Sequence, residues 1–445
     1  MSLSPADYPE HYTINKESKY YREMIPRPMY EQLFAKAKMM ACGFLCQQDP
    51  SHAQIFKENW ESIAKDLEEP FFKETMYEFF AGCFDPESVI FKVSMRSLVA
   101  KISLYGRFCI ERNLAKDAIE TIPIKKPIYI VALPRSGSTF THTMLGCDKR
   151  AKTVMLYEHI CPGNKTTTTQ ARQLITEQII GQVTTDGQDM NKCHNMDNVM
   201  MPEEELFFME TLAHTHIFGN SIPRWEQYRE SCYTRDWDKV YYAVLDEIRM
   251  SALEFPMKED GHFLLKCVSH FMTPAPFFNI MNDDKFDSKI VWIHREPVDE
   301  FKSCFYLLLN ARARFKGDLG EDDYLWLQQN ILKVNEICLK NSFALREKWI
   351  AAKPERANRI IDIGFREMIA DPVAVTQRIY DKFGLDLAED VKTQIVAAAK
   401  EGDRQGAHGR MAKNKDDFLI SDDKIREQFK WYYDMYGKYM PKFYN

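Results

Sequence analysis

Residues 127–145 read PIYIVALPRSGSTFTHTML and place a compact set of hydrogen-bond donors directly after an apolar run. The apolar run predicts a buried strand, and the pattern from Ser138 onward predicts a helix. Backbone N–H groups at the start of a helix, joined by the guanidinium of Arg135 and nearby hydroxyl groups, are suited to bind an anion such as phosphate. Gly137 allows the backbone to approach that anion closely. An ordinary strand-to-helix turn, capped by serine or threonine, is the alternative without a ligand.

This loop differs from the Walker A loop of ATP-using enzymes. The Walker pattern GxxxxGK[ST] requires an upstream glycine and a lysine after the second glycine, whereas Ser138 follows Gly137 here. Carboxylates placed to hold Mg²⁺ are not evident in the sequence either. A P-loop nucleotide kinase is therefore kept only as an alternative function, and no metal site is predicted.

A second polar cluster follows another apolar run, in residues 290–308, IVWIHREPVDEFKSCFYLL. Arg295 stands at the predicted end of a strand, and Ser303 lies eight positions later on the helix that should follow. Ligands of open parallel sheets bind at the carboxyl edge of the strands, so both side chains could meet a second phosphate there. An ion pair of Arg295 with Glu296 or Asp299 is the alternative.

Together the two segments resemble the sulfotransferase superfamily, whose sulfate donor is 3′-phosphoadenosine 5′-phosphosulfate (PAPS). In that family a loop of the form P-[KR]-[ST]-G-[ST]-T holds the 5′-phosphosulfate, and a strand-Arg-x7-Ser segment holds the 3′-phosphate. The resemblance implies that PAPS is the co-substrate and is bound by Arg135, Ser136, Gly137, Ser138, Thr139, Arg295 and Ser303. Phe140 stands where cytosolic relatives have a tryptophan and could stack on adenine; core packing is its alternative role.

Four further segments carry the same resemblance, which covers residues 126–437. Residues 264–278, LLKCVSHFMTPAPFF, look like the K-S-P-x-H-L strand end of bacterial-type sulfotransferases, which implies that Lys266 and His270 lie beside the donor. Residues 201–209, MPEEELFFM, match an acidic segment of that branch. Residues 361–387 resemble the family's D-P and F-G-L stretch. The basic residues of the tail, Arg410 among them, are implied to approach the nucleotide.

The resemblance implies an in-line transfer of a sulfuryl group, helped by positioning and by charge stabilisation from Arg135. His270 is the first choice for the base, because a neutral imidazole accepts protons near pH 7. Glu204 is the competitor. Its neighbours Glu203 and Glu205 are expected with it on one helix, where only one or two of the three can face inward. Lys266 is expected to touch the leaving sulfate or to support the loop.

Short apolar runs alternate with longer helical patterns along the rest of the chain. Strands are predicted at residues 128–132, 263–267, 289–294 and 359–363, and helices at 203–212, 237–253 and 324–348. This alternation predicts an α/β fold, a P-loop-like parallel sheet with helices on both faces. Residues 1–120 show helical periodicity and are expected to form an N-terminal region packed on a catalytic domain at 121–445.

Composition limits the classes of partner. The net charge of −6 gives no reason to expect a nucleic-acid or anionic-membrane surface. The 11 cysteines form no CxxC pair, and no long apolar stretch predicts a signal or a membrane span, so a cytoplasmic protein with reduced thiols is expected. The expected acceptor is a soluble small molecule, sulfated on oxygen or alternatively on nitrogen. A non-catalytic nucleotide-binding relative and a homodimer are both kept open.

Overall fold

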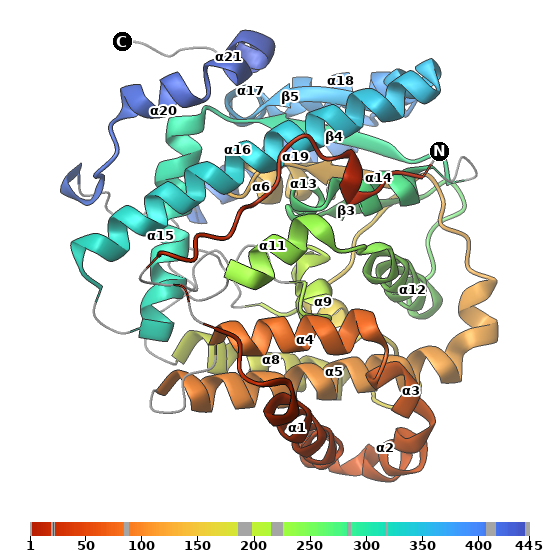
Figure 1. The fold of residues 1–445 in the computed structure, drawn as a ribbon. Helices are drawn as coiled ribbons and strands as arrows, with labels where there is room; N and C mark the ends of the chain where they lie inside the picture. The colour runs from red at the N-terminus through yellow and green to blue at the C-terminus, as the bar shows by residue number, and fades with distance from the viewer. Residues whose placement is uncertain are drawn as a thin grey trace.

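The computed structural model describes residues 2–18, 21, 23–83, 89–185, 198–214, 226–282, 286–316, 319–405 and 415–440 (Figure 1). Its sheet has the strand order β2-β3-β1-β4-β5, and every pairing is parallel. The strands are β1 (Ile128–Val131), β2 (Ala151–Lys152), β3 (His262–Lys266), β4 (Lys289–His294) and β5 (Ile360–Gly364). The four predicted strands are confirmed to within one residue at either end. Strand β2 was not predicted because its two residues form no apolar run.

Strand β1 lies at the centre of the sheet and is buried along its whole length. Its register pairs Tyr129 with Leu265 of β3 and Ile130 with Val291 of β4. Since all the strands run in the same direction, their carboxyl ends meet at one edge. The segments that follow β1, β3 and β4 are therefore neighbours at that edge.

Helices cover both faces of the sheet, as predicted. On one face, Ile128 and Ile130 join a core with side chains of α6 (Ser138–Leu145), α18 (Pro372–Phe383) and α19 (Glu389–Gln405). On the other face, Tyr129 belongs to a larger core that extends into the N-terminal helices. The alternation of successive side chains between two apolar layers explains why the strand reads as continuously hydrophobic.

The described part of residues 27–120 contains five α-helices: α1 (Arg27–Gln48), α2 (Ala53–Trp60), α3 (Ala64–Leu67), α4 (Pro70–Cys83) and α5 (Val89–Glu120). Figure 1 shows them gathered at the end of the molecule farthest from β5. Phe34 of α1 and Phe108 of α5 belong to the same buried cluster as Tyr129 of the sheet. The apolar core is thus continuous from these helices to β1.

The remaining α-helices of the part of the chain that the structure describes are α7 (Leu156–Ile160), α8 (Thr169–Thr185), α9 (Leu206–Thr211), α11 (Glu226–Thr234), α12 (Asp238–Glu254), α13 (Ser269–Met272), α14 (Pro274–Met281), α15 (Pro297–Lys316), α16 (Glu321–Ala352), α17 (Phe365–Ala370), α20 (Asp422–Gln428) and α21 (Lys430–Tyr436). Among the described residues, none of the helices combines the length and the apolar character that a membrane crossing needs.

One predicted helix begins later than expected. The expected helix at residues 203–212 is observed only from Leu206, so the three preceding glutamates are not helical. Their segment pairs instead with the chain before α7: Pro202 bridges to Met155, and the backbone N–H of Glu203 donates to the carbonyl of Val154 at 3.0 Å. Because the segment is not helical, all three side chains can face inward, and all three are buried.

Candidate active site

The loop between β1 and α6 adopts the tight conformation that an anion cradle needs. Arg135 has φ +63° and Gly137 has φ +86°, both in the left-handed region. Gly137 is the N-cap of α6, and the side chains of Ser136 and Ser138 are buried. Left-handed residues at a helix start direct successive N–H groups toward one point. The loop predicted from the sequence therefore has the backbone expected of an anion site.

The ends of β1 and β4 meet directly. The guanidinium of Arg295 donates a hydrogen bond to the backbone carbonyl of Arg135. Nε of Arg135 in turn donates to Oγ of Ser303 on α15 at 3.1 Å. The structure thus brings together Arg135, Arg295 and Ser303, which are up to 168 positions apart in the sequence.

Phe365, the first residue after β5, lies between these two clusters. The guanidinium carbon of Arg295 stands 4.4 Å from the centre of the Phe365 ring, a cation–π contact. A Cβ added to Gly137 would lie only 2.3 Å from Cδ2 of the same ring. Gly137 is therefore required both by its backbone conformation and by the close approach of Phe365.

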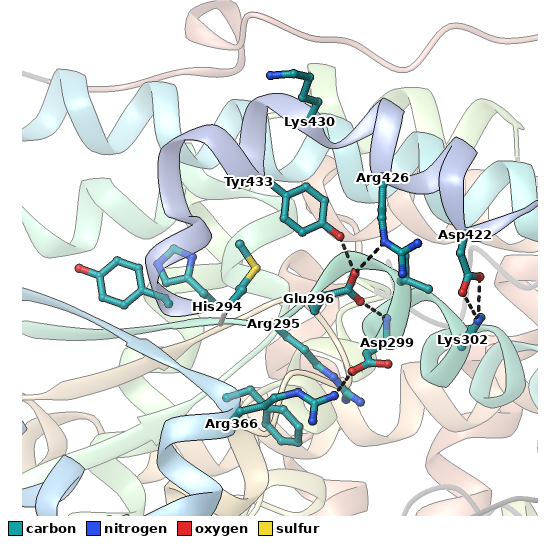
Figure 2. A pocket seen from close by; sticks show the side chains of 14 residues that line it. His294, Arg295, Glu296, Asp299, Lys302, Arg366, Asp422, Arg426, Lys430 and Tyr433 are labelled. Carbon is teal, nitrogen blue, oxygen red and sulfur yellow. Dashed lines mark hydrogen bonds and ion pairs between the residues drawn. The ribbon is translucent and has the colours of Figure 1, made fainter. Parts of the chain in front are cut away.

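A cavity of about 350 Å³ opens beside Arg295 (Figure 2). Five of its lining side chains carry a positive charge: Arg295, Lys302, Arg366, Arg426 and Lys430. Carboxylates hold several of them in place, as in the pairs Arg366–Asp299 at 2.6 Å and Lys302–Asp422 at 2.7 Å. Three carboxylates, of Glu296, Asp299 and Asp422, line the same cavity, so the excess of positive charge is two. An excess of guanidinium and ammonium groups is suited to a phosphate.

Sequence reasoning missed Lys302, Arg366, Arg426 and Lys430. Arg366 could have been found from the sequence, because it follows Phe365 in a segment that resembles the sulfotransferases. For the basic residues of α20 and α21, the only indication in the sequence was the general resemblance of the tail. Arg410, the tail residue that was predicted to approach the nucleotide, lies outside the described residues.

Lys266 ends β3 and lies against the anion loop. Its Nζ is 3.2 Å from Oγ1 of Thr139 and 3.4 Å from a carboxylate oxygen of both Glu203 and Glu204. The side chain is 0% exposed. Burial by itself would lower the pKa of Lys266, but the two carboxylates outweigh burial and raise the pKa above its ordinary value. The lysine is therefore held positively charged beside the loop.

Glu203 and Glu204 differ little in their access to solvent. The side chain of Glu204 is 8% exposed and that of Glu203 is 3% exposed. Oε2 of Glu204 also accepts a hydrogen bond from the backbone N–H of Val268 at 3.3 Å. Glu204 is thus fixed beside Lys266, and both carboxylates are buried.

His270 lies in an aromatic environment on α13. Its ring stacks on Phe277 with 4.3 Å between the ring centres and packs edge to face with Tyr129. Its Nδ1 is 3.2 Å from the hydroxyl of Tyr241. Burial lowers the pKa of His270 to about 3. This position does not favour the predicted role of His270 as the base, because the ring is enclosed by core side chains and binds protons weakly.

Phe140 is only partly buried and packs against the core that α6 shares with α18 and α19. That contact agrees with core packing, the alternative role considered for this ring. A stacking role on adenine stays a prediction.

Comparison with known proteins identifies the family and the fold. Residues 127–390 match the sulfotransferase family, and because this match covers more than half of the chain, the protein belongs to that family. Solved sulfotransferases share the fold. STF1 from Mycobacterium tuberculosis H37Rv has a TM-score of 0.63 at 17% identity, over 84% of this chain and 97% of its own. STF9 from Mycobacterium avium has a TM-score of 0.62 at 16% identity, over 85% of this chain and 96% of its own. No curated protein sequence matches the chain.

Proposed function

We propose that this protein transfers the sulfuryl group of PAPS to a hydroxyl, or alternatively a nitrogen, of a small-molecule acceptor. The observation that carries the proposal is the contact between the ends of β1 and β4, where Arg295 and Ser303 both bind Arg135. Two anion-binding elements that share one edge match a donor with a phosphate at either end of one nucleoside.

The residues at this edge fit the charges of that donor. Arg135, the N–H groups of the loop and the hydroxyl groups of Ser138 and Thr139 would hold the 5′-phosphosulfate. Arg295 and Ser303, beside a cavity with five positively charged side chains, would hold the 3′-phosphate. Lys266 would stabilise the negative charge that develops on the bridging oxygen during transfer. Arg366 and Arg426 are further candidates for the nucleotide.

The proposed reaction is a single in-line displacement. The acceptor oxygen forms a bond to sulfur while the bond from sulfur to the bridging phosphate oxygen breaks, and 3′-phosphoadenosine 5′-phosphate leaves with that electron pair. Glu204 would receive the acceptor proton, because it lies beside Lys266, whereas His270 is enclosed by core side chains. We propose a cytoplasmic location and a soluble acceptor on the sequence alone.

Thermal unfolding in the presence of nucleotides tests the proposal. We expect 3′-phosphoadenosine 5′-phosphate to raise the midpoint without Mg²⁺, because a ligand that binds only the folded state stabilises it. Adenosine 5′-phosphate, which lacks the 3′-phosphate, should raise it much less. Stabilisation only by ATP with Mg²⁺ would support the kinase alternative and contradict the proposal.

The variant Arg295→Ala sharpens this test. Losing a charge-assisted contact costs about 1.5–3 kcal/mol, so affinity for 3′-phosphoadenosine 5′-phosphate should fall roughly 10- to 150-fold. Arg378→Ala, which removes an exposed arginine paired with Glu367, is the matched control and should bind like the wild type.

Acceptors can then be sought by incubating the protein with labelled donor and metabolite extracts, with a gain of sulfate read by mass.

A further inference from the structure

A second cluster of reactive side chains lies in the core behind the proposed site. Cys267 and His270 are separated by two residues at the end of β3, and Glu205 comes from the segment that precedes α9. One potential ligand atom from each side chain lies within 4.8 Å of the other two, and all three residues are buried. The Cys-x2-His spacing is one that lets two neighbouring residues bind the same metal ion.

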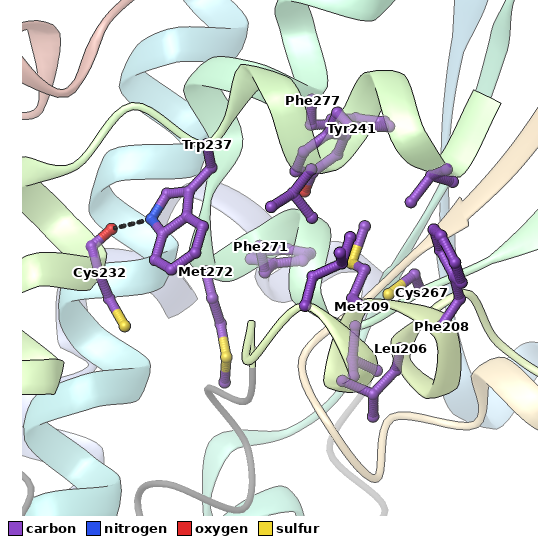
Figure 3. Packing of buried hydrophobic residues seen from close by; sticks show 14 of the residues in the cluster. Leu206, Phe208, Met209, Cys232, Trp237, Tyr241, Cys267, Phe271, Met272 and Phe277 are labelled. Carbon is purple, nitrogen blue, oxygen red and sulfur yellow. Dashed lines mark hydrogen bonds between the residues drawn. The ribbon is translucent and has the colours of Figure 1, made fainter. Parts of the chain in front are cut away.

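Three buried polar atoms of this cluster have no hydrogen-bond partner among the described residues. Both carboxylate oxygens of Glu205 and Nε2 of His270 are buried without any hydrogen bond. Buried polar groups are normally satisfied, so these unpaired atoms in one buried cluster need an explanation, and a bound cation supplies one. Leu206, Phe208 and Met209 lie around Cys267 (Figure 3).

The contact of Nδ1, the other ring nitrogen of His270, is also consistent with metal binding through Nε2. Nδ1 lies 3.2 Å from the hydroxyl of Tyr241, and that hydroxyl is 3.0 Å from Oγ1 of Thr273. A tyrosine that accepts a hydrogen bond from Nδ1–H fixes the tautomer that leaves a lone pair on Nε2. Histidines that bind metals commonly donate their other ring N–H to such a partner.

We propose that Glu205, Cys267 and His270 bind a zinc ion. A thiolate, an imidazole and a carboxylate are the ligands that zinc prefers, whereas Mg²⁺ and Ca²⁺ prefer oxygen ligands alone. Three protein ligands leave a fourth position of the tetrahedron for water or another small ligand.

The role of this ion would be to position residues of the transfer site. Glu205 directly follows Glu204, and Cys267 directly follows Lys266. An ion held by Glu205 and Cys267 therefore joins the two segments that carry Lys266 and Glu204. It would fix their separation without contacting the donor or the acceptor.

Metal analysis of the full-length protein, purified without a metal-affinity tag, tests the proposal. We expect zinc in a stoichiometric amount after dialysis, and its loss in Cys267→Ser. The matched control is Cys338→Ser, which removes a thiol that is equally buried but lies on α16. This control should retain the zinc. Stoichiometric zinc in Cys267→Ser, or none in the wild type even after incubation with zinc, would overturn the proposal.

Cobalt provides a readout that does not depend on the folding of a variant. After removal of zinc and addition of Co²⁺, the wild-type protein should show the near-ultraviolet absorption of a thiolate bound to cobalt. If that absorption is absent from the wild type, Cys267 does not bind a metal and the proposal fails. Neither measurement requires transferase activity, so this inference and the proposed function can fail separately.

Discussion

The ammonium group of Lys266 lies among three polar partners, the hydroxyl of Thr139 and the carboxylates of Glu203 and Glu204. The two carboxylates are at the same distance from Nζ, 3.4 Å, so distance alone does not separate their roles. Their burial does not separate them either, because both are buried. We propose Glu204, the candidate named from the sequence, as the group that receives the proton.

The variants Glu204→Gln and Glu203→Gln test this assignment. Each removes one negative charge from Lys266, but only the first removes the proposed base. We expect Glu204→Gln to lower kcat by about 10²–10⁴-fold, the usual contribution of general base catalysis. Glu203→Gln should keep most of kcat, and both should bind 3′-phosphoadenosine 5′-phosphate like the wild type. Equal losses of kcat would mean that Glu204 acts only through Lys266.

At the scale of elements, the turn from β1 to α6 places the N-terminus of α6 directly at the end of β1. Two left-handed residues, Arg135 and Gly137, reverse the chain so that α6 begins at the strand end. Arginine in this conformation is less favourable than glycine, and the bond from Arg295 to the carbonyl of Arg135 holds it there. The conformation of the loop therefore depends on the neighbouring strand.

Gly137→Ala tests the steric requirement of this turn. The new methyl group meets a positive φ and the ring of Phe365, which together should lower the free energy of unfolding by about 2–4 kcal/mol. Nucleotide binding should weaken as well, since the loop must shift. Gly181→Ala, in α8 where an added Cβ meets open space, is the control and should stabilise the protein by about 0.5–1 kcal/mol. Urea denaturation measures both, and an unchanged stability of Gly137→Ala would contradict the geometry.

At the scale of the whole molecule, a partly buried polar network connects the sheet with the C-terminal helices. Asp362 of β5 binds Arg346 of α16 at 2.6 and 2.8 Å and lies 2.9 Å from Nε2 of His294 on β4. Nδ1 of His294 is 2.9 Å from the hydroxyl of Tyr432 on α21. Burial alone would raise the pKa of Asp362, but Arg346 and His294 outweigh it and hold this pKa well below its usual range.

The lowered pKa of Asp362 gives a stability contribution with a defined pH dependence. The contribution is complete above the ordinary pKa of aspartate, about 3.9, and is lost as the pH falls below it toward the pKa of the folded state. Asp362→Asn should therefore lower the free energy of unfolding at pH 7 by about 1.5–3 kcal/mol, the usual contribution of a hydrogen bond to a charged group. The difference from the wild type should shrink below about pH 4.

Urea denaturation of both proteins between pH 7 and pH 3 measures this effect. Asp381→Asn, which changes an exposed aspartate on α18, is the control and should show little change at any pH. A difference between Asp362→Asn and the wild type that stays constant over the whole series would contradict the role of the carboxylate charge.

Local sequence determined much of the fold and part of the site. The strands were predictable because strands buried on both faces read as short apolar runs, and their parallel order places the ends of β1, β3 and β4 at one edge. Arg135, Arg295 and Ser303 could be named from their positions at strand ends, and the resemblance to sulfotransferases extended the site to Lys266.

Tertiary packing decided the rest. The segment of Glu203–Glu205 pairs with residues near Met155 rather than extending α9, and His270 is enclosed by aromatic side chains from α12, α14 and β1. Burial and partners of a side chain depend on segments far away in the chain, which local periodicity does not contain. For the same reason, only the structure brings Glu205 to Cys267 and His270, and Arg366 to the cavity beside Arg295.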